Sequence, residues 1–216
     1  MIRIAIDGPG GAGKSTIARR VAGVLGLDYI DTGAMYRAIG LAAMQKKTDL
    51  KDDHQVARLL SESRIDFHDE KIFLDEKDVS AAIRTPEAAD MASRVSAIPA
   101  VRDKLIALQR AMGQNRNVVM DGRDIGTNVL KDAEVKIYLT ATPKERARRR
   151  YEELLSKGKQ ADYDAVLQAI EKRDHADMTR AVDPLRKAAD AKELDTTNMS
   201  IEEVVAAITK EAEPWQ

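Results

Sequence analysis

The sequence has no cysteine, which excludes disulfide bridges, thiolate metal sites and a cysteine nucleophile. Its three histidines, His54, His68 and His175, lie far apart and lack the spacing of metal ligands. The chain also lacks the charged-then-apolar layout of a signal peptide, and it has no apolar run long enough to span a membrane. We therefore expect a soluble cytoplasmic protein with no membrane partner.

Neither sign of charge dominates, because 35 basic residues are balanced by 36 acidic ones and the formal net charge is -1. This balance gives no general attraction to nucleic acid, so we expect no nucleic-acid partner, and any recognition of phosphate must be local. With 216 residues the chain suits one α/β domain with small insertions. We expect it to be a monomer.

Five short apolar runs alternate with helical patterns, which is typical of a parallel sheet covered by helices. The runs span residues 2–6, 28–31, 117–121, 135–139 and 193–195. The helix after the first run is predicted to bury a stripe made of Ile17, Val21, Val24 and Leu25. Capping boxes are predicted at two later helix starts, Thr142 with Glu145 and Ser200 with Glu203.

Two segments interrupt this alternation. Residues 64–80 form short β-like pieces broken by acidic turns, so we expect a small antiparallel insertion there. Residues 156–162 contain Lys157-Gly158-Lys159 between two charged helices, which favours a mobile loop.

A glycine-rich loop follows the first predicted strand and precedes the first predicted helix. Its residues, Gly8-Pro9-Gly10-Gly11-Ala12-Gly13-Lys14-Ser15, match the pattern G-x-x-x-x-G-K-[ST], and Thr16 comes next. Glycines let backbone N–H groups turn inward, and the helix N-terminus adds partial positive charge. We predict an ATP site in which Lys14 reaches the β- and γ-phosphates and Ser15 ligates Mg²⁺. The alternative is a chance glycine-rich turn, which the flanking strand and helix argue against.

In the segment 163–180 an apolar stripe becomes a charged one. Its members are spaced by three or four residues and so share one helix face: Tyr163, Val166, Ile170, Arg173, Asp177 and Arg180. Buried arginine and aspartate need anionic or hydroxyl partners, which a substrate cleft would supply. The alternative is an ion pair within the helix between Arg173 and Asp177.

A second cluster, Arg146, Arg148, Arg149 and Arg150, opens the helix before the predicted mobile loop. If this region is a lid, Arg146 and Arg150 share one face and close over the transferring phosphoryl group, which excludes water. For any one of these arginines the alternative is a solvated helix face.

Together with the glycine loop, three further motifs resemble those of bacterial cytidylate kinases, a family of P-loop nucleoside monophosphate kinases. They are Asp31-Thr32-Gly33-Ala34-Met35-Tyr36-Arg37, Asp121-Gly122-Arg123-Asp124-Ile125-Gly126-Thr127 and Arg173-Asp174-His175-Ala176-Asp177-Met178-Thr179-Arg180. The resemblance runs from Ile4 to about Thr197. The chain departs from the family at Met178, where a small or polar residue is expected, and at Thr32, which replaces a common serine and keeps the hydroxyl.

The resemblance implies a P-loop NTPase-type α/β fold, in which a five-stranded parallel sheet is flanked by helices and carries an inserted NMP-binding subdomain and a short lid. The core would comprise residues 1–32, 97–142 and 163–216, the NMP-binding insertion residues 33–96, and the lid residues 143–162. The implied reaction is transfer of the γ-phosphoryl group of ATP to CMP or dCMP, with Mg²⁺ as cofactor.

The resemblance also assigns roles to residues. Positions that match contacts to the acceptor phosphate are Thr32, Arg37, Arg123 and Arg180; those that match sugar contacts are Tyr36, Arg173 and Asp177; those that match cytosine contacts are Ser93, Arg102 and Asp124. The cytosine set agrees with base chemistry, because a carboxylate accepts from the N4 amino group while N3 and O2 are acceptors suited to Arg102 and Ser93. Uracil would present an acceptor to Asp124, so CMP should be preferred over UMP.

The acceptor in this reaction is a phosphate monoester that is largely dianionic at neutral pH, so no general base is needed. Catalysis would rest on in-line positioning and on neutralisation of charge by Mg²⁺ and by Lys14, Arg123, Arg146, Arg150 and Arg180. Asp121 ends the third predicted strand and is the candidate for holding Mg²⁺ through a water ligand. The alternative is an aspartate that only caps Gly122.

Two other functions fit a P-loop. One is a kinase acting on a hydroxyl, with Asp31 or Asp124 as base, and the other is a nucleotide-dependent switch that hydrolyses slowly. The number of arginines argues against the first, and no water-positioning element supports the second.

Overall fold

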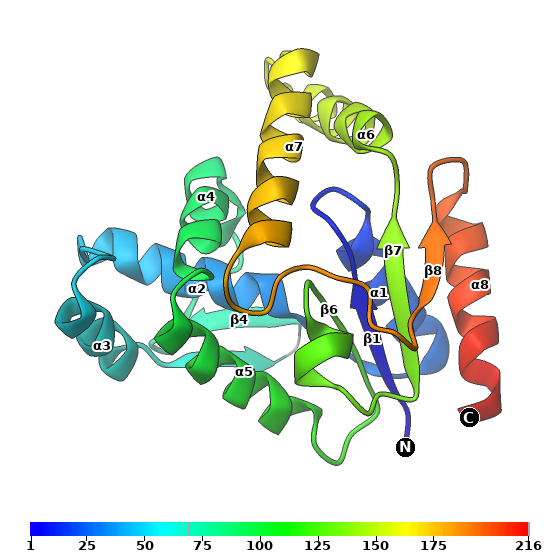
Figure 1. Cartoon of the computed structure of the whole chain (residues 1–216), viewed down its shortest axis with the longest axis horizontal. Helices are drawn as coiled ribbons and strands as arrows, with labels where there is room; N and C mark the ends of the chain where they lie inside the picture. The colour runs from blue at the N-terminus through cyan, green and yellow to red at the C-terminus, as the bar shows by residue number, and fades with distance from the viewer. Residues whose placement is uncertain (69, 216) are drawn as a thin grey trace. The chain divides into compact units, whose positions relative to one another are not determined.

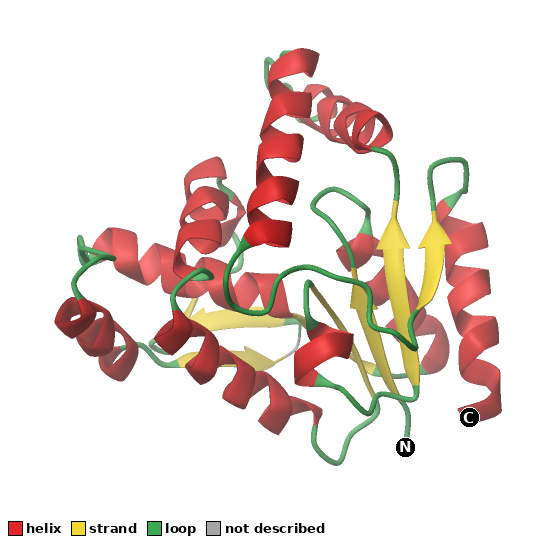
Figure 2. Ribbon diagram, in the orientation of Figure 1, coloured by secondary structure: helices red, strands yellow, loops and turns green. Residues whose placement is uncertain are grey.

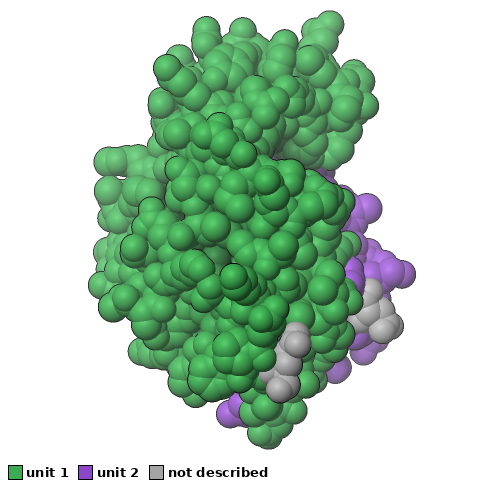
Figure 3. Space-filling view, turned by 90° about the vertical axis from the view of Figure 1, so that its right-hand side faces the viewer, with its two compact units in different colours: residues 1–29, 115–216 green, residues 30–114 purple. Residues whose placement is uncertain are grey.

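The computed structural model describes residues 1–68 and 70–215. The chain divides into two compact units, which Figure 3 colours separately. Unit 1 consists of residues 1–29 and 115–216, and unit 2 of residues 30–114. Each unit contains its own apolar core, and each is described by itself.

A five-stranded parallel sheet organises unit 1, with the strand order β2-β6-β1-β7-β8 (Figures 1 and 2). Its strands are β1 (Arg3–Asp7), β2 (Asp28–Asp31), β6 (Val118–Gly122), β7 (Val135–Thr140) and β8 (Lys192–Asp195). The first two residues of β2 belong to unit 1. Every strand lies within one residue of a predicted apolar run at each end, which confirms the α/β fold class.

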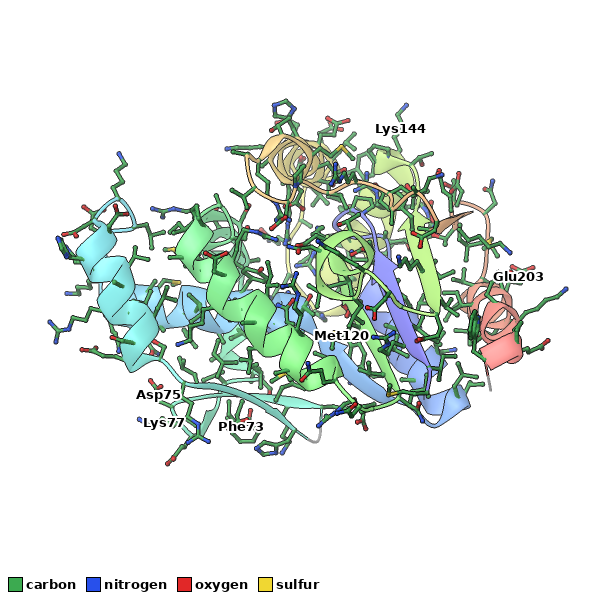
Figure 4. All side chains as sticks on the ribbon, turned by 60° about the horizontal axis from the view of Figure 1, so that its bottom comes forward. Phe73, Asp75, Lys77, Met120, Lys144 and Glu203 are labelled. Atoms are coloured by element: carbon green, nitrogen blue, oxygen red, sulfur yellow. The ribbon has the colours of Figure 1, made fainter. Side chains whose placement is uncertain are left out.

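The strand β1 lies in the middle of the sheet, with β6 on one side and β7 on the other. Ala5 is opposite Met120 of β6, which Figure 4 labels, and Ile4 is opposite Val135 of β7. A strand with neighbours on both edges and helices on both faces must be apolar throughout, and Ile4 to Ile6 are fully buried.

Parallel strands end at the same edge of a sheet, so the segments that follow β1, β6 and β7 lie at one edge. There β1 leads into the glycine loop and α1 (Lys14–Leu25), β6 into the helical turn η2 (Ile125–Val129), and β7 into α6 (Pro143–Ser156). The other helices of unit 1 are α7 (Tyr163–Thr179), α8 (Ile201–Ala212) and the short η3 (Glu213–Trp215). Figure 1 shows α6 beside α7 and α8 beside β8.

The stripe predicted on α1 is partly wrong. Ile17 and Val21 are buried, and so are Ala18 and Ala22, but Val24 is 66% exposed. At about 100° per residue, Val24 lies roughly 90° from the centre of the buried face and therefore at its edge.

The two predicted capping boxes differ in the structure. Ser200 and Glu203 form a complete box at the start of α8, with hydrogen bonds in both directions. At α6 the side chain of Thr142 accepts from Glu145 N at 3.3 Å, but the carboxylate of Glu145 accepts from Arg148 and Arg149 instead. Charge-assisted hydrogen bonds to guanidinium groups are stronger than one to a neutral N–H, so the second half of this box is missing.

Unit 2 is mainly helical and holds a small separate sheet. Its helices are α2 (Thr32–Gln45), α3 (Asp53–Glu62), η1 (Ala82–Arg84), α4 (Pro86–Val95) and α5 (Pro99–Gly113). The strands β3 (Ile65–His68), β4 (Lys71–Leu74) and β5 (Lys77–Asp78) pair antiparallel. This sheet lies where the sequence predicts an antiparallel insertion; residue 69 is outside the described residues. Figure 4 labels Phe73, Asp75 and Lys77 around its second turn.

Within residues 1–68 and 70–215, no helix has both the length and the apolar content that crossing a bilayer requires.

Candidate active site

The glycine loop fills the connection between β1 and α1 as predicted from its sequence. A side chain at Gly8 is impossible, because a Cβ built there would lie 1.9 Å from the backbone oxygen of Leu139 on the neighbouring strand. Gly13 is the N-cap residue of α1 and has a φ of 85°, a conformation that residues with a Cβ rarely adopt. These two glycines bring the loop close to the sheet edge and direct it into the helix.

Lys14 is the first residue of α1, and its side chain is only 6% exposed. Its Nζ donates to the carbonyl oxygen of Pro9 at 2.8 Å, so the side chain curls back over the loop. Burial lowers the pKa of Lys14 to about 7, with the positive charges of Arg123 and Arg173 acting in the same direction and Asp121 and Asp177 opposing them. An anion placed beside this buried ammonium group would therefore be bound strongly.

The hydroxyl of Ser15 and the carboxylate of Asp121 lie at the end of the loop. Ser15 Oγ donates to Asp121 Oδ2 at 2.9 Å, and the hydroxyl of Tyr29 donates to Asp121 Oδ1 at 2.9 Å. Asp121 is buried inside β6 and is held by these two side chains, so its described role goes beyond capping Gly122. Two oxygens of this kind at a P-loop suit Mg²⁺, which prefers hard oxygen ligands.

Two arginines lie over Gly10. A Cβ built on Gly10 would be 3.6 Å from Nη2 of Arg123 and 3.5 Å from Cδ of Arg173. Arg123 Nε donates to Asp177 Oδ2 at 2.7 Å. Burial raises the pKa of Asp177, but the charge of Arg123 and the hydrogen bond from it outweigh this and hold the pKa below its usual value. The structure therefore brings the end of β6 and the charged face of α7 to the glycine loop.

Arg180 and Asp124 form a second pair in unit 1. Arg180 Nη2 lies 3.4 Å from Asp124 Oδ1, and Arg180 Nε donates to the carbonyl of Asp183 at 2.8 Å. The prediction that Arg180 continues the helix face needs correction, because α7 ends at Thr179 and Arg180 has the extended ψ of 144°. Arg180 thus reaches Asp124 from the loop after α7, while Arg173 and Asp177 lie on the helix itself.

The two predicted lid arginines have different surroundings. Arg146 is 3% exposed, and its guanidinium donates to Ala141 O at 2.9 Å, to Gly10 O at 2.8 Å and to Asp174 Oδ2 at 2.6 Å. Arg150 is exposed and pairs with Glu153 at 2.7 Å on the same helix. Arg146 therefore holds the start of α6, the glycine loop and α7 together.

The remaining predicted site residues belong to unit 2. Thr32, Tyr36 and Arg37 lie on the first turns of α2, Ser93 on α4 and Arg102 on α5. Arg102 is 1% exposed, and its guanidinium carbon is 5.8 Å from the centre of the Tyr36 ring. Arg37 Nη2 donates to Asp31 Oδ2 at 2.8 Å, while Asp31 Oδ1 caps α2 through Ala34 N. Asp31 is thus occupied as a helix cap and ion-pair partner.

Two buried carboxylates near the loop are absent from the predicted set. Asp7, the last residue of β1, accepts from the backbone of η2, and Asp174 accepts from Arg146. Asp7 could have been noticed because a charged residue at the end of a buried central strand needs hydrogen-bond partners. Asp174 stands next to Arg173 in a motif that the sequence analysis used, but its partner is 28 residues away and is fixed only by the fold.

The fold and the loop define a P-loop kinase. A similar fold is found in shikimate kinase from Bacteroides thetaiotaomicron, with a TM-score of 0.51 and 16% identity over 98% of both chains. The family model described as cytidylate kinase matches residues 4–214, and the chain belongs to this family. Similar relatives include the cytidylate kinases of Carboxydothermus hydrogenoformans, 50% identical over 96% of this chain and 95% of that one, and of Lactobacillus gasseri, 49% identical over 97% and 93%. The predicted family is confirmed, and the chain is a nucleoside monophosphate kinase.

Proposed function

We propose that the residues around the glycine loop carry out the reaction of the cytidylate kinase family, in which the γ-phosphoryl group of ATP passes to CMP or dCMP and leaves CDP or dCDP and ADP. The chain would thereby serve pyrimidine nucleotide metabolism. The observation that carries the proposal is the gathering of Lys14, Arg123 and Arg173 at the glycine loop. Three neighbouring cations repel one another and are stabilised when a polyanion lies between them.

ATP is assigned to the loop from Gly8 to Thr16. The N–H groups at the start of α1 and the buried ammonium of Lys14 would bind its β- and γ-phosphates. Ser15 would ligate Mg²⁺ directly and Asp121 would hold a water of the ion, which fits their 2.9 Å separation and oxygen chemistry. When bound, Mg²⁺ supplies charge neutralisation at the phosphates.

A set of CMP contacts is proposed for each unit by itself. In unit 1, Arg123 and Arg180 would bind its phosphate, Arg173 and Asp177 its sugar, and Asp124 the amino group of cytosine. In unit 2 the corresponding sets are Thr32 and Arg37, then Tyr36, and then Ser93 with Arg102. The contact between Arg102 and Tyr36 supports the unit 2 set, because residues assigned to base and sugar are neighbours.

The chemistry then needs positioning more than proton transfer. A phosphate monoester with a second pKa near 6 is already a nucleophile at neutral pH. Lys14, Arg123 and Arg180 would neutralise the transferring group directly. Residues 143–162 are proposed as a lid that brings Arg150 to the same group, with Arg146 at its base.

An acceptor panel tests the proposal. The protein with ATP and Mg²⁺ is given CMP, dCMP, UMP or cytidine, and ADP release is measured together with product identity. We expect CDP and dCDP as the main products and a much slower reaction with UMP. Faster turnover of cytidine than of CMP would indicate a hydroxyl kinase, and ADP release that ignores the acceptor would indicate a switch protein.

We also propose that the enzyme acts as a cytoplasmic monomer without nucleic-acid or membrane partners. The near-zero net charge supports the absence of nucleic-acid and membrane partners, because it offers no broad attraction for a polyanionic surface. Sedimentation at enzyme concentrations used in the assay would test the monomer.

A further inference from the structure

Asp7 is a buried carboxylate with an unusual pair of partners. It ends β1, is 4% exposed, and uses its two oxygens on two neighbouring backbone groups. Ile125 N donates to Oδ1 at 2.8 Å, and Gly126 N donates to Oδ2 at 2.7 Å. These N–H groups begin the helical turn η2, so Asp7 caps that turn from a different strand.

The residue that would normally cap η2 is Asp124. It occupies the N-cap position, with φ −144° and ψ 29°, but among the described residues its side chain makes no capping hydrogen bond. Elsewhere in this chain, aspartates at N-cap positions do cap their own helices: Asp31 on α2, Asp52 on α3 and Asp162 on α7. Asp124 is therefore an exception among N-cap aspartates of the same chain.

The carboxylate of Asp124 has another use. Its Oδ1 faces Arg180 Nη2 at 3.4 Å, and it is buried. Its Oδ2 accepts from Asn128 Nδ2 of η2 at 3.5 Å, so the carboxylate lies between its own turn and Arg180. Asp7 holds the first two N–H groups of the turn, directly after Asp124, and so fixes the backbone that carries this carboxylate.

We propose that Asp7 is a positioning residue that holds the turn next to Asp124, so that the Asp124 carboxylate is placed to read the cytosine base. By capping η2 from β1, it fixes the backbone directly after Asp124, whose carboxylate lies between Asn128 of the turn and Arg180. The proposal rests on the assignment of cytosine to Asp124 made above, and it adds a residue that does not touch the substrate.

The charges around Asp7 agree with a functional carboxylate. The ionised carboxylate accepts well with both oxygens, whereas protonation turns one oxygen into a donor and a poorer acceptor. Burial raises the pKa of Asp7 to about 6, aided by Asp124, whereas the two N–H groups and Lys14 of α1 lower it. On β7, the negative charge of Asp7 is among the causes that raise the pKa of Tyr138, and the aliphatic part of Lys136 lies beside Gly126.

The test is Asp7→Asn, which keeps the volume but replaces one acceptor by a donor facing an N–H. We expect KM for CMP to rise at least tenfold and the ratio of kcat/KM for CMP over UMP to fall at least tenfold, while KM for ATP changes less than twofold. Asp52→Asn removes an ordinary N-cap aspartate from α3 and is the matched control. It should leave the CMP to UMP ratio unchanged.

A double variant shows whether Asp7 acts through Asp124. In Asp7→Asn/Asp124→Asn the CMP to UMP ratio should equal that of Asp124→Asn alone, because the second residue is already disabled. Multiplied effects would overturn the proposal, and so would a normal ratio in Asp7→Asn. A normal ratio in Asp124→Asn would instead overturn the assignment of cytosine to Asp124.

Folding is followed by circular dichroism and thermal melting of every variant. If Asp7→Asn does not fold, Asp7→Ser keeps one acceptor in a smaller side chain and should show the same loss of discrimination. Failure of both variants to fold would assign Asp7 to structure alone and would contradict the positioning role.

Discussion

Binding of ATP to the free protein above neutral pH is expected to draw a proton from solution onto Lys14. Burial and the neighbouring charges of Arg123 and Arg173 hold the pKa of this lysine at about 7. Phosphate oxygens placed against Nζ would reverse the sign of the local field, and the pKa would return toward the ordinary lysine value of about 10.4. The protonated form then becomes the bound form.

The size of the effect follows from these two pKa values. At pH 8 Lys14 is protonated to about a tenth in the free protein and almost completely in the complex, so binding takes up about 0.9 proton. Above pH 7 the affinity for ATP should fall about tenfold per pH unit, or about 1.4 kcal/mol, until the pKa of the complex is reached. ATP adds little to this number at pH 8, because its terminal phosphate has a pKa near 6.

Titration calorimetry measures the uptake directly. Mg-ATP is titrated into the protein at pH 8 in two buffers that differ in ionisation enthalpy, and the slope of the observed enthalpy gives the number of protons. Lys14→Met is the control, and its slope should be near zero. A flat plot for the wild type, or an equal slope in Lys14→Met, would refute the reasoning that bound ATP raises the pKa of the buried lysine and so protonates it.

Three further outcomes are expected. Arg180→Ala should lower kcat/KM for CMP by on the order of 100-fold or more, because one preorganised donor to phosphate is lost; a wild-type rate with an intact circular dichroism spectrum would remove Arg180 from the site. Asp124→Asn should lower the ratio of kcat/KM for CMP over UMP at least about tenfold, because the amide can donate to the uracil carbonyl that the carboxylate would leave unpaired; the acceptor panel measures this ratio. Gly23→Ala should raise stability by about 1 kcal/mol without changing activity, because a Cβ there meets no atom within 4 Å inside α1; a thermal melt that shifts downward would contradict this.

The sheet and the glycine loop could be predicted because their signals are local. Each buried strand is a short apolar run between helical patterns, and residues 8–15 carry their own backbone requirements. The charged face of α7 was also predictable, since helical spacing places Arg173 and Asp177 together whatever the rest of the chain does. In all these cases the cause lies within about twenty residues.

What the sequence could not predict depends on partners far along the chain. Arg146 is held by Gly10 and Asp174. Asp7 accepts from the N–H groups of Ile125 and Gly126, which lie 118 and 119 positions further along the chain. Glu145 shows the same limit at short range, because its pattern fits a capping box while Arg148 and Arg149 compete for it. Hydrogen bonds from Arg148 and Arg149 lower the pKa of Glu145 to about 2, despite the opposing effect of burial. Spacing names the candidates, but competition among charges selects the pair.

The two shifted groups beside the loop show why this selection matters for function. Lys14 and Asp7 carry opposite charges close enough to affect one another. Even so, the pKa of Asp7 is raised and that of Lys14 is lowered, and both shifts favour the neutral form of the group. A direct ion pair would relieve both, but it would also cancel the field that holds a phosphate. The chain gives each a backbone partner instead, with Lys14 on the carbonyl of Pro9 and Asp7 on two N–H groups of η2. Backbone dipoles satisfy hydrogen bonding without neutralising a unit charge, so the positive field at the loop remains available to ATP.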